Sequence, residues 1–154
     1  MDNELRIKYY SNQFLKLNCA HVYGRRILAK PIFVLTIISA IEEGIVSDNK
    51  FYWKDNPGYN KFHELYKSIY VSYQPNECLT PMYKPFYHLK NDGFWHHDIK
   101  DPNSIPRAAT HKYLSENLNY AYLDQTLWDL LQDHNVRNEF RTQIVNFFLR
   151  PNNN

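Results

Sequence analysis

The residues best suited to chemistry stand in the sequence His96-His97-Asp98, directly after an aromatic stretch. Imidazole and carboxylate groups are common ligands of a catalytic metal ion, which activates a bound water. Neighbouring side chains on a strand point to opposite faces, so His96 and Asp98 share a face while His97 lies on the other. With His111 added, they define one hypothesis, a small metal-dependent nuclease. No helix follows directly to supply a further ligand, and a polar strand edge is the alternative.

Other catalytic patterns are missing from the sequence. Cys19 and Cys78 lie far apart and form no CxxC pair, which argues against a zinc ribbon and favours a reducing, cytoplasmic setting. The four glycines have no phosphate-loop spacing. We therefore predict no metal and no cofactor. The longest apolar run, residues 31–41, is too short to cross a membrane, so no membrane partner is expected.

Basic residues gather in two segments, although the net charge is only +2. Arg25, Arg26 and Lys30 surround the start of a predicted helix, where the helix dipole favours an anion such as a DNA phosphate. The second segment lies in the loop 104–112. Its candidates for contacts with base edges in a major groove are Arg107, Thr110, His111 and Lys112. For both segments the alternative is an ordinary solvated loop.

A mainly α (α+β) domain is predicted to position these residues. The chain of 154 residues, 44% hydrophobic and 16% aromatic, fits one domain at 1–150 with a polar tail at 151–154. Helices are predicted at 4–17, 30–43, 59–71, 124–132 and 134–149, the second apolar on almost every side. A short strand is predicted at 51–53. Residues 85–89 and 94–98 are predicted to form a β-hairpin around Asn91-Asp92-Gly93.

The helical period also predicts which side chains face the core, and Asp124 is predicted to cap the helix that follows it. The expected inward residues are Leu5, Tyr9 or Tyr10, Phe14 and Leu17; Phe62, Leu65, Tyr66 and Ile69; Leu127, Leu130 and Leu131; and Val136, Phe140, Ile144, Phe147 and Phe148.

Three segments together resemble one bacterial family. They are "AKPIFVLTIISAIEEG", "KPFYHLKNDGFW" and "NYAYLDQTLWDLLQDHNVRNEFRTQIVNFFL", in this order. The family comprises the sulfur-binding domains, which precede the catalytic module in many HNH-type restriction endonucleases. These domains recognise phosphorothioated DNA, in which sulfur replaces a non-bridging phosphate oxygen. The similarity spans residues 20–149, nearly the whole chain.

The resemblance implies a shallow apolar cavity for the sulfur, with Pro85 as a wall and Lys84, Phe86 and His88 beside it. Sulfur is larger and less strongly hydrated than oxygen, so an apolar cavity favours it. The resemblance also places Lys30 and its neighbours on backbone phosphates and the loop 104–112 on the bases. Lys84 departs from the family, because a tyrosine usually stands at this position.

The favoured interpretation is a non-catalytic module of a restriction or defence system that binds double-stranded, phosphorothioated DNA, with a nuclease domain or subunit as a further partner. One alternative is the small HNH-like nuclease built on His96, Asp98 and His111. Another is a protein-interaction domain that recruits a nuclease through its aromatic surface.

Overall fold

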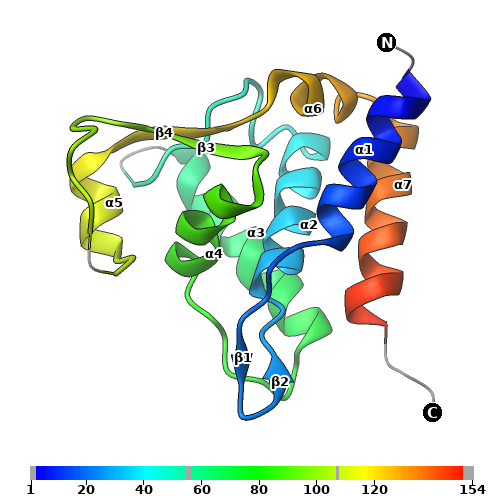
Figure 1. Ribbon diagram of the computed structural model, residues 1–154, viewed down its shortest axis with the longest axis horizontal. Helices are drawn as coiled ribbons and strands as arrows, with labels where there is room; N and C mark the ends of the chain where they lie inside the picture. The colour runs from blue at the N-terminus through cyan, green and yellow to red at the C-terminus, as the bar shows by residue number, and fades with distance from the viewer. Residues whose placement is uncertain (1–2, 55–56, 107, 151–154) are drawn as a thin grey trace.

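The computed structural model describes residues 3–54, 57–106 and 108–150. Its helices are α1 (Asn3–Leu15), α2 (Ala29–Glu42), α3 (Pro57–Tyr73), α4 (Tyr83–His88), α5 (His111–Asn117), α6 (Gln125–Leu130) and α7 (His134–Ile144). A 3₁₀ turn, η1 (Leu89–Asp92), follows α4, and a π-helical turn, η2 (Val145–Leu149), follows α7. The strands are β1 (His21–Val22), β2 (Arg25–Arg26), β3 (Trp95–Ile99) and β4 (Leu118–Leu123). The prediction of a mainly helical domain with a small β part is confirmed (Figure 1).

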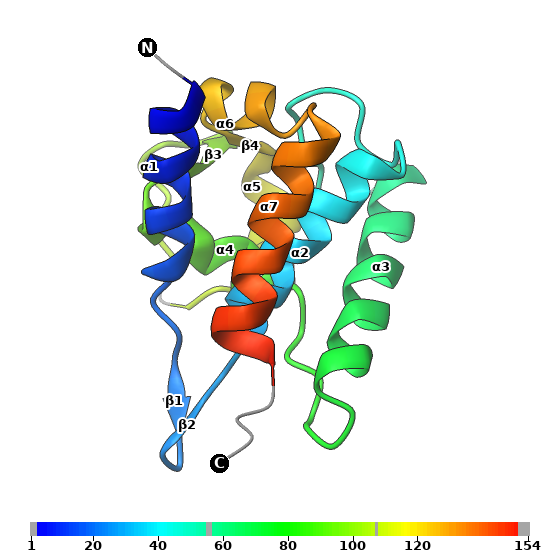
Figure 2. The same ribbon diagram turned by 90° about the vertical axis from the view of Figure 1, so that its right-hand side faces the viewer.

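Helix α2 forms the centre of the core, as predicted. It packs against α3, α4 and α7, and Figure 2 shows it passing between α3 and α7. Most of its residues are buried, including Ile32, Phe33 and Ile38, which are fully so. Pro31 stands in the first turn, where its missing N–H has no helical partner to lose. The helix ends before Gly44, whose φ of +72° suits the left-handed conformation that terminates helices.

The predicted core faces of α1 and α3 are largely confirmed, with differences at single positions. Tyr10, Phe14 and Leu17 are buried, but Leu5 and Tyr9 are exposed, because α7 and α6 cover only one side of α1. In α3, Phe62, Tyr66 and Tyr70 are buried, whereas Leu65 and Ile69 are half-buried.

The closing helices are also confirmed, with two corrections. The prediction that Phe147 faces the core is wrong, because its side chain is exposed. Phe147 lies in the π-helical turn, where the wider winding shifts side chains from the positions that an α-helix would give them. Asp124 precedes α6 but makes no capping hydrogen bond with its side chain. Its carboxylate instead accepts a hydrogen bond from the hydroxyl of Tyr10 at 2.8 Å and lies 2.5 Å from Nε2 of His96.

The predicted hairpin at 85–98 is wrong. Its first half is helical, and Met82, Phe86 and Leu89 are buried at the spacing of one helix face. Pro85 fits in the first turn, where a residue needs no N–H for a helical bond. Gly93, at φ +95°, ends the 3₁₀ turn instead of closing a hairpin. Only the second half is extended, as β3.

The true partner of β3 is β4, which comes from the segment after the loop. The two strands pair antiparallel, with Trp95 opposite Leu123 and His97 opposite Ala121. The strand predicted at 51–53 is reduced to a single bridge between Phe51 and Ala121. A second sheet, the hairpin of β1 and β2, was predicted as loop and projects from the lower end of the molecule in Figures 1 and 2.

Among the helices that the structure describes, none combines the length and the apolar character that a membrane crossing requires.

Candidate nucleic-acid interface

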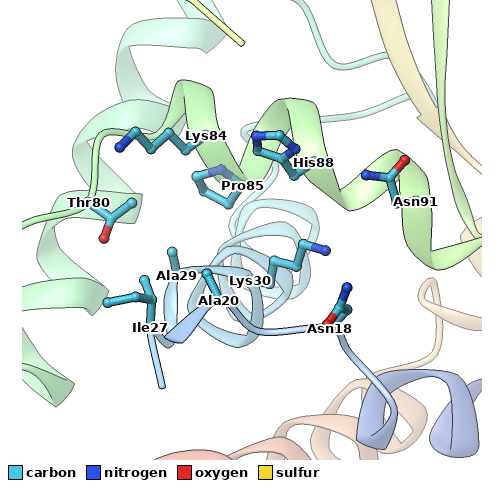
Figure 3. Close-up of a pocket in the computed structure, with 10 residues that line it drawn as sticks. All are labelled: Asn18, Ala20, Ile27, Ala29, Lys30, Thr80, Lys84, Pro85, His88 and Asn91. Atoms are coloured by element: carbon cyan, nitrogen blue, oxygen red, sulfur yellow. The ribbon is translucent and has the colours of Figure 1, made fainter. Parts of the chain in front are cut away.

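A cavity of about 390 Å³ lies between α4, the start of α2 and the base of the β1–β2 hairpin. Figure 3 shows Pro85 facing from α4 toward Ala20 and Ala29 on the opposite side, with His88 on the next turn of α4. The lining residues are Asn18, Ala20, Ile27, Ala29, Lys30, Thr80, Lys84, Pro85, His88 and Asn91. Small and apolar side chains thus form much of the wall, and amides and basic groups surround them. The structure brings together four of the predicted site residues, namely Lys30, Lys84, Pro85 and His88.

Helix α4 is fixed to the sheet by two hydrogen bonds to one atom. The backbone oxygen of Phe86 accepts from Nε1 of Trp95 at 2.8 Å and from Nε2 of His97 at 3.1 Å. Burial is the main reason that the pKa of His97 falls from its ordinary value of 6.5 to about 4. The imidazole is therefore neutral at neutral pH, and it carries its proton on Nε2 because a carbonyl oxygen only accepts.

Phe86 does not line the cavity, in contrast to its predicted role beside the sulfur. Its side chain is fully buried and packs edge-on against Phe33, Trp53 and Trp95. Because Pro85 and Phe86 are consecutive residues of a helix, they point about 100° apart, and only one of them faces the cavity. Phe86 therefore anchors the helix that presents Pro85.

Lys30 reaches the cavity as one half of an ion pair. Its ammonium lies 2.7 Å from Oδ2 of Asp92, and the side chains are only 11% and 7% exposed. The other carboxylate oxygen of Asp92 accepts a hydrogen bond from the backbone N–H of Asn18 at 3.1 Å. Asp92 thus holds the first turn of α2 to the chain segment that enters the hairpin. It also balances part of the charge that Lys30 presents to the cavity.

Lys84 and His88 are the exposed basic groups at the rim. Figure 3 shows the side chain of Lys84 extended along α4 toward Thr80, with its ammonium at the edge of the cavity. The pKa of His88 is lowered, first by partial burial and then by the positive charges of Lys30, Lys90 and Lys84. His88 is therefore neutral at neutral pH in the free protein. The same three charges give this rim a positive potential, which favours an anion.

Arg25 and Arg26 lie on β2, outside this cavity. They line a neighbouring groove of about 600 Å³, which shares Ile27, Thr80 and Lys84 with the cavity. The guanidinium of Arg25 lies 2.8 Å from a carboxylate oxygen of Glu77, and both side chains remain well exposed. The guanidinium of Arg26 lies over the ring of Phe148. The predicted phosphate-binding residues therefore occupy two adjoining surfaces.

Three of the predicted base-contacting residues, Thr110, His111 and Lys112, stand at the start of α5 and do not line the cavity. Arg107 lies outside the described residues. Thr110 caps α5, its hydroxyl accepting a hydrogen bond from the backbone N–H of Tyr113 at 3.0 Å. Nδ1 of His111 accepts from Nε1 of Trp53 at 3.0 Å, and Lys112 is exposed. Thr110 and His111 therefore have structural partners and keep exposed surface.

The three residues of the metal hypothesis have separate partners. His96 contacts Asp124, while Asp98, on the same strand face, lies 3.4 Å from the amide of Asn119. His111, the first residue of α5, contacts Trp53, as described above. In the described parts of the chain no group of three His, Cys, Asp or Glu residues is arranged to hold a metal ion.

Sequence reasoning missed the opposite wall of the cavity, made by Ala20, Ile27 and Ala29. Asn18, Thr80 and Asn91 complete the lining and were also missed. The only sequence signal near them is the Lys-Pro pair that opens α2. Small apolar residues in a loop carry no pattern of their own, so tertiary structure alone identifies them.

The chain as a whole has the fold of a sulfur-binding domain, which confirms the predicted resemblance at the level of the fold. The particular structure it resembles is the sulfur-binding domain of ScoMcrA, solved in complex with phosphorothioated DNA. The superposition covers 94% of this chain and 90% of that one, with a TM-score of 0.66 and 15% sequence identity. The sequence matches no protein-family model and no curated protein.

Proposed function

We propose that this protein is a non-catalytic DNA-binding module that recognises a phosphorothioate through the cavity beneath α4. The observation that carries the proposal is the position of Pro85, which forms one apolar wall of a cavity with basic groups at its rim. The ScoMcrA domain has the same fold and was solved with phosphorothioated DNA, which supports this ligand.

The chemistry of the cavity suits a sulfur atom next to a phosphate. Ala20, Ile27, Ala29 and Pro85 offer apolar contacts, which favour a large, weakly hydrated sulfur over a strongly hydrated oxygen. The remainder of the phosphorothioate is anionic, and Lys84 stands at the rim to pair with it. The neutral ring of His88 contributes a further polar edge.

The rest of the DNA contacts follow from the neighbouring surfaces. Arg25 and Arg26 would bind backbone phosphates beside the cavity, and Lys30 would approach one from within it. The loop 104–112 and the start of α5 would bring Arg107, Thr110, His111 and Lys112 to the base edges. In this proposal the phosphate contacts supply most of the affinity, and the contacts to the bases supply the sequence preference.

The proposal includes a place in a restriction or defence system, where a nuclease domain or a nuclease subunit would cut the DNA that this module binds. The partners of His96, Asp98 and His111 described above give the alternative of an HNH-like nuclease no support. The alternative of a protein-interaction domain predicts no affinity for any DNA.

A fluorescence-polarisation titration with two matched duplexes, one carrying a single phosphorothioate, tests the function. We expect the sulfur-bearing duplex to bind more tightly. In Pro85→Ala, which removes the ring from the cavity wall, the preference should fall while binding to the ordinary duplex is retained. Equal affinity of the unsubstituted protein for both duplexes would exclude sulfur recognition and leave general DNA binding.

A further inference from the structure

The β1–β2 hairpin carries an aromatic side chain in an unusual position. Tyr23 and Gly24 form its two-residue turn, both with positive φ, at 51° and 77°. Turns of this kind favour Asn-Gly, because bulky residues rarely adopt positive φ. Tyr23 is also fully exposed, so its ring contributes no burial energy to the fold. A strained residue without a folding benefit indicates a role in binding.

The surface around this turn is basic and apolar together. Val22 and Tyr23 are exposed at the tip, and they line the same groove as Arg25, Arg26 and Lys84. Against these three cations the groove has one carboxylate, that of Glu77. The excess of positive charge complements a polyanion, and the apolar tip complements a less polar groove between its charged edges.

The hairpin also has a fixed geometric relation to the proposed phosphorothioate site. Its base is closed by the hydrogen bond from the N–H of Ile27 to the backbone oxygen of Ala20, at 2.7 Å, and both residues line the cavity. Tyr23 lies three positions after Ala20, which at about 3.3 Å per residue gives a reach of about 10 Å. This length is comparable to the depth of a DNA groove, about 7.5–8.5 Å.

From these observations we infer that the hairpin is a second DNA-contacting element. With a backbone phosphate in the cavity, Tyr23 enters the adjacent groove of the duplex, and Arg25 and Arg26 bind the phosphates at its edge. The inference rests on the proposed function and adds to it a contact that is independent of sulfur. Tyr23 accordingly contributes equally to the binding of ordinary and phosphorothioated DNA.

The variant Tyr23→Asn separates binding from folding, because it creates the Asn-Gly sequence that the turn prefers. We expect the hairpin to persist and the affinity for both duplexes to fall by the same factor, about fivefold or more, as on truncation of an interface aromatic. The dependence of affinity on salt should be unchanged, since no charge is lost. Arg26→Ala should instead reduce the salt slope by about 0.9, the loss of one phosphate contact.

Tyr52→Ala is the matched control. Tyr52 is an exposed tyrosine that packs on Tyr120 of β4. Strand β4 lies at the end of the molecule opposite the hairpin (Figure 1). The Tyr52→Ala variant should bind both duplexes with the affinity of the unsubstituted protein. If Tyr23→Asn also binds normally while Pro85→Ala loses its preference for sulfur, the inference is overturned and the proposed function stands. If the unsubstituted protein binds neither duplex, both are overturned.

Discussion

The hydrogen bond from His97 to Phe86 makes the attachment of α4 sensitive to pH. The imidazole is neutral and half-buried, and its Nε2 donates to the carbonyl oxygen that also accepts from Trp95. Protonation would place a positive charge in this poorly hydrated site. We predict that acidification destabilises the protein through His97, and that His97→Gln removes this part of the pH dependence because a glutamine amide donates without titrating.

The size of this loss in the free energy of unfolding follows from the pKa of His97 in the folded protein and in the unfolded chain. His97 has a pKa of about 4 in the folded protein and an ordinary value of 6.5 in the unfolded chain. Between these values the unfolded chain binds the proton and the folded protein does not, so the free energy of unfolding decreases as the pH falls. From pH 7 to pH 5 the loss is about 2 kcal/mol. The destabilisation due to His97 is absent well above pH 6.5 and reaches its full size below pH 4.

Urea unfolding at a series of pH values between 7 and 5 measures this contribution. The half-buried ring also packs against Phe86 and Tyr87, so His97→Gln should be less stable than the unsubstituted protein at pH 7. The informative quantity is the difference in pH dependence, because His63 and His88 titrate alike in both proteins. If the two curves of unfolding free energy against pH are parallel, the assignment of this pH dependence to His97 is refuted.

Two further predictions concern the ion-pair partner of Lys30 and the lysine at the rim of the cavity. Asp92→Asn removes one partner of a nearly buried ion pair and should lower the free energy of unfolding by about 3 kcal/mol or more. In urea unfolding, a loss below about 1 kcal/mol, the range of surface pairs such as Arg25–Glu77, would contradict this. Lys84→Tyr should reduce the salt slope of DNA binding by about 0.9 and raise the preference for sulfur. An unchanged preference in polarisation titrations would show that residue 84 does not contact the sulfur.

The helical part of the fold was predictable because burial imposes a period on the sequence. The apolar residues of α2 and the spacing of Phe62 and Tyr66 in α3 are properties of single segments. The choice between neighbouring residues stayed open where only tertiary packing decides it. Tyr9 and Tyr10 are chemically identical, but only Tyr10 faces a partner, the carboxylate of Asp124.

The predicted hairpin failed for a related reason. Asn91-Asp92-Gly93 is compatible with a hairpin turn and equally with the end of a helix, because both use a glycine at positive φ. The choice depends on which strand pairs with β3. That partner is β4, which lies beyond a long loop. A local pattern contains no information on this pairing, so the sequence predicted the strand β3 and missed its neighbour.

The cavity combines a predictable wall with an unpredictable one. Pro85 and Lys84 were identified through a resemblance, whereas Ala20 and Ile27 come from the hairpin that was predicted as loop. The prediction for Phe86 failed because its role follows from the helical phase of α4. Once that segment is a helix, the residue after Pro85 must face the core.

The division of the site into charged rim and apolar wall separates affinity from specificity. A phosphate diester and a phosphorothioate diester carry the same net charge, so Lys84 attracts both and its Coulomb energy discriminates weakly between them. Discrimination must arise where the sulfur and the oxygen differ, in size and hydration, and therefore at Pro85 and the small residues opposite it. A lysine at position 84 is thus compatible with sulfur recognition, provided that the apolar wall alone supplies the preference. For this reason the salt slope separates the two variants: Pro85→Ala should change the sulfur preference with the salt slope intact, whereas Lys84→Tyr should change both.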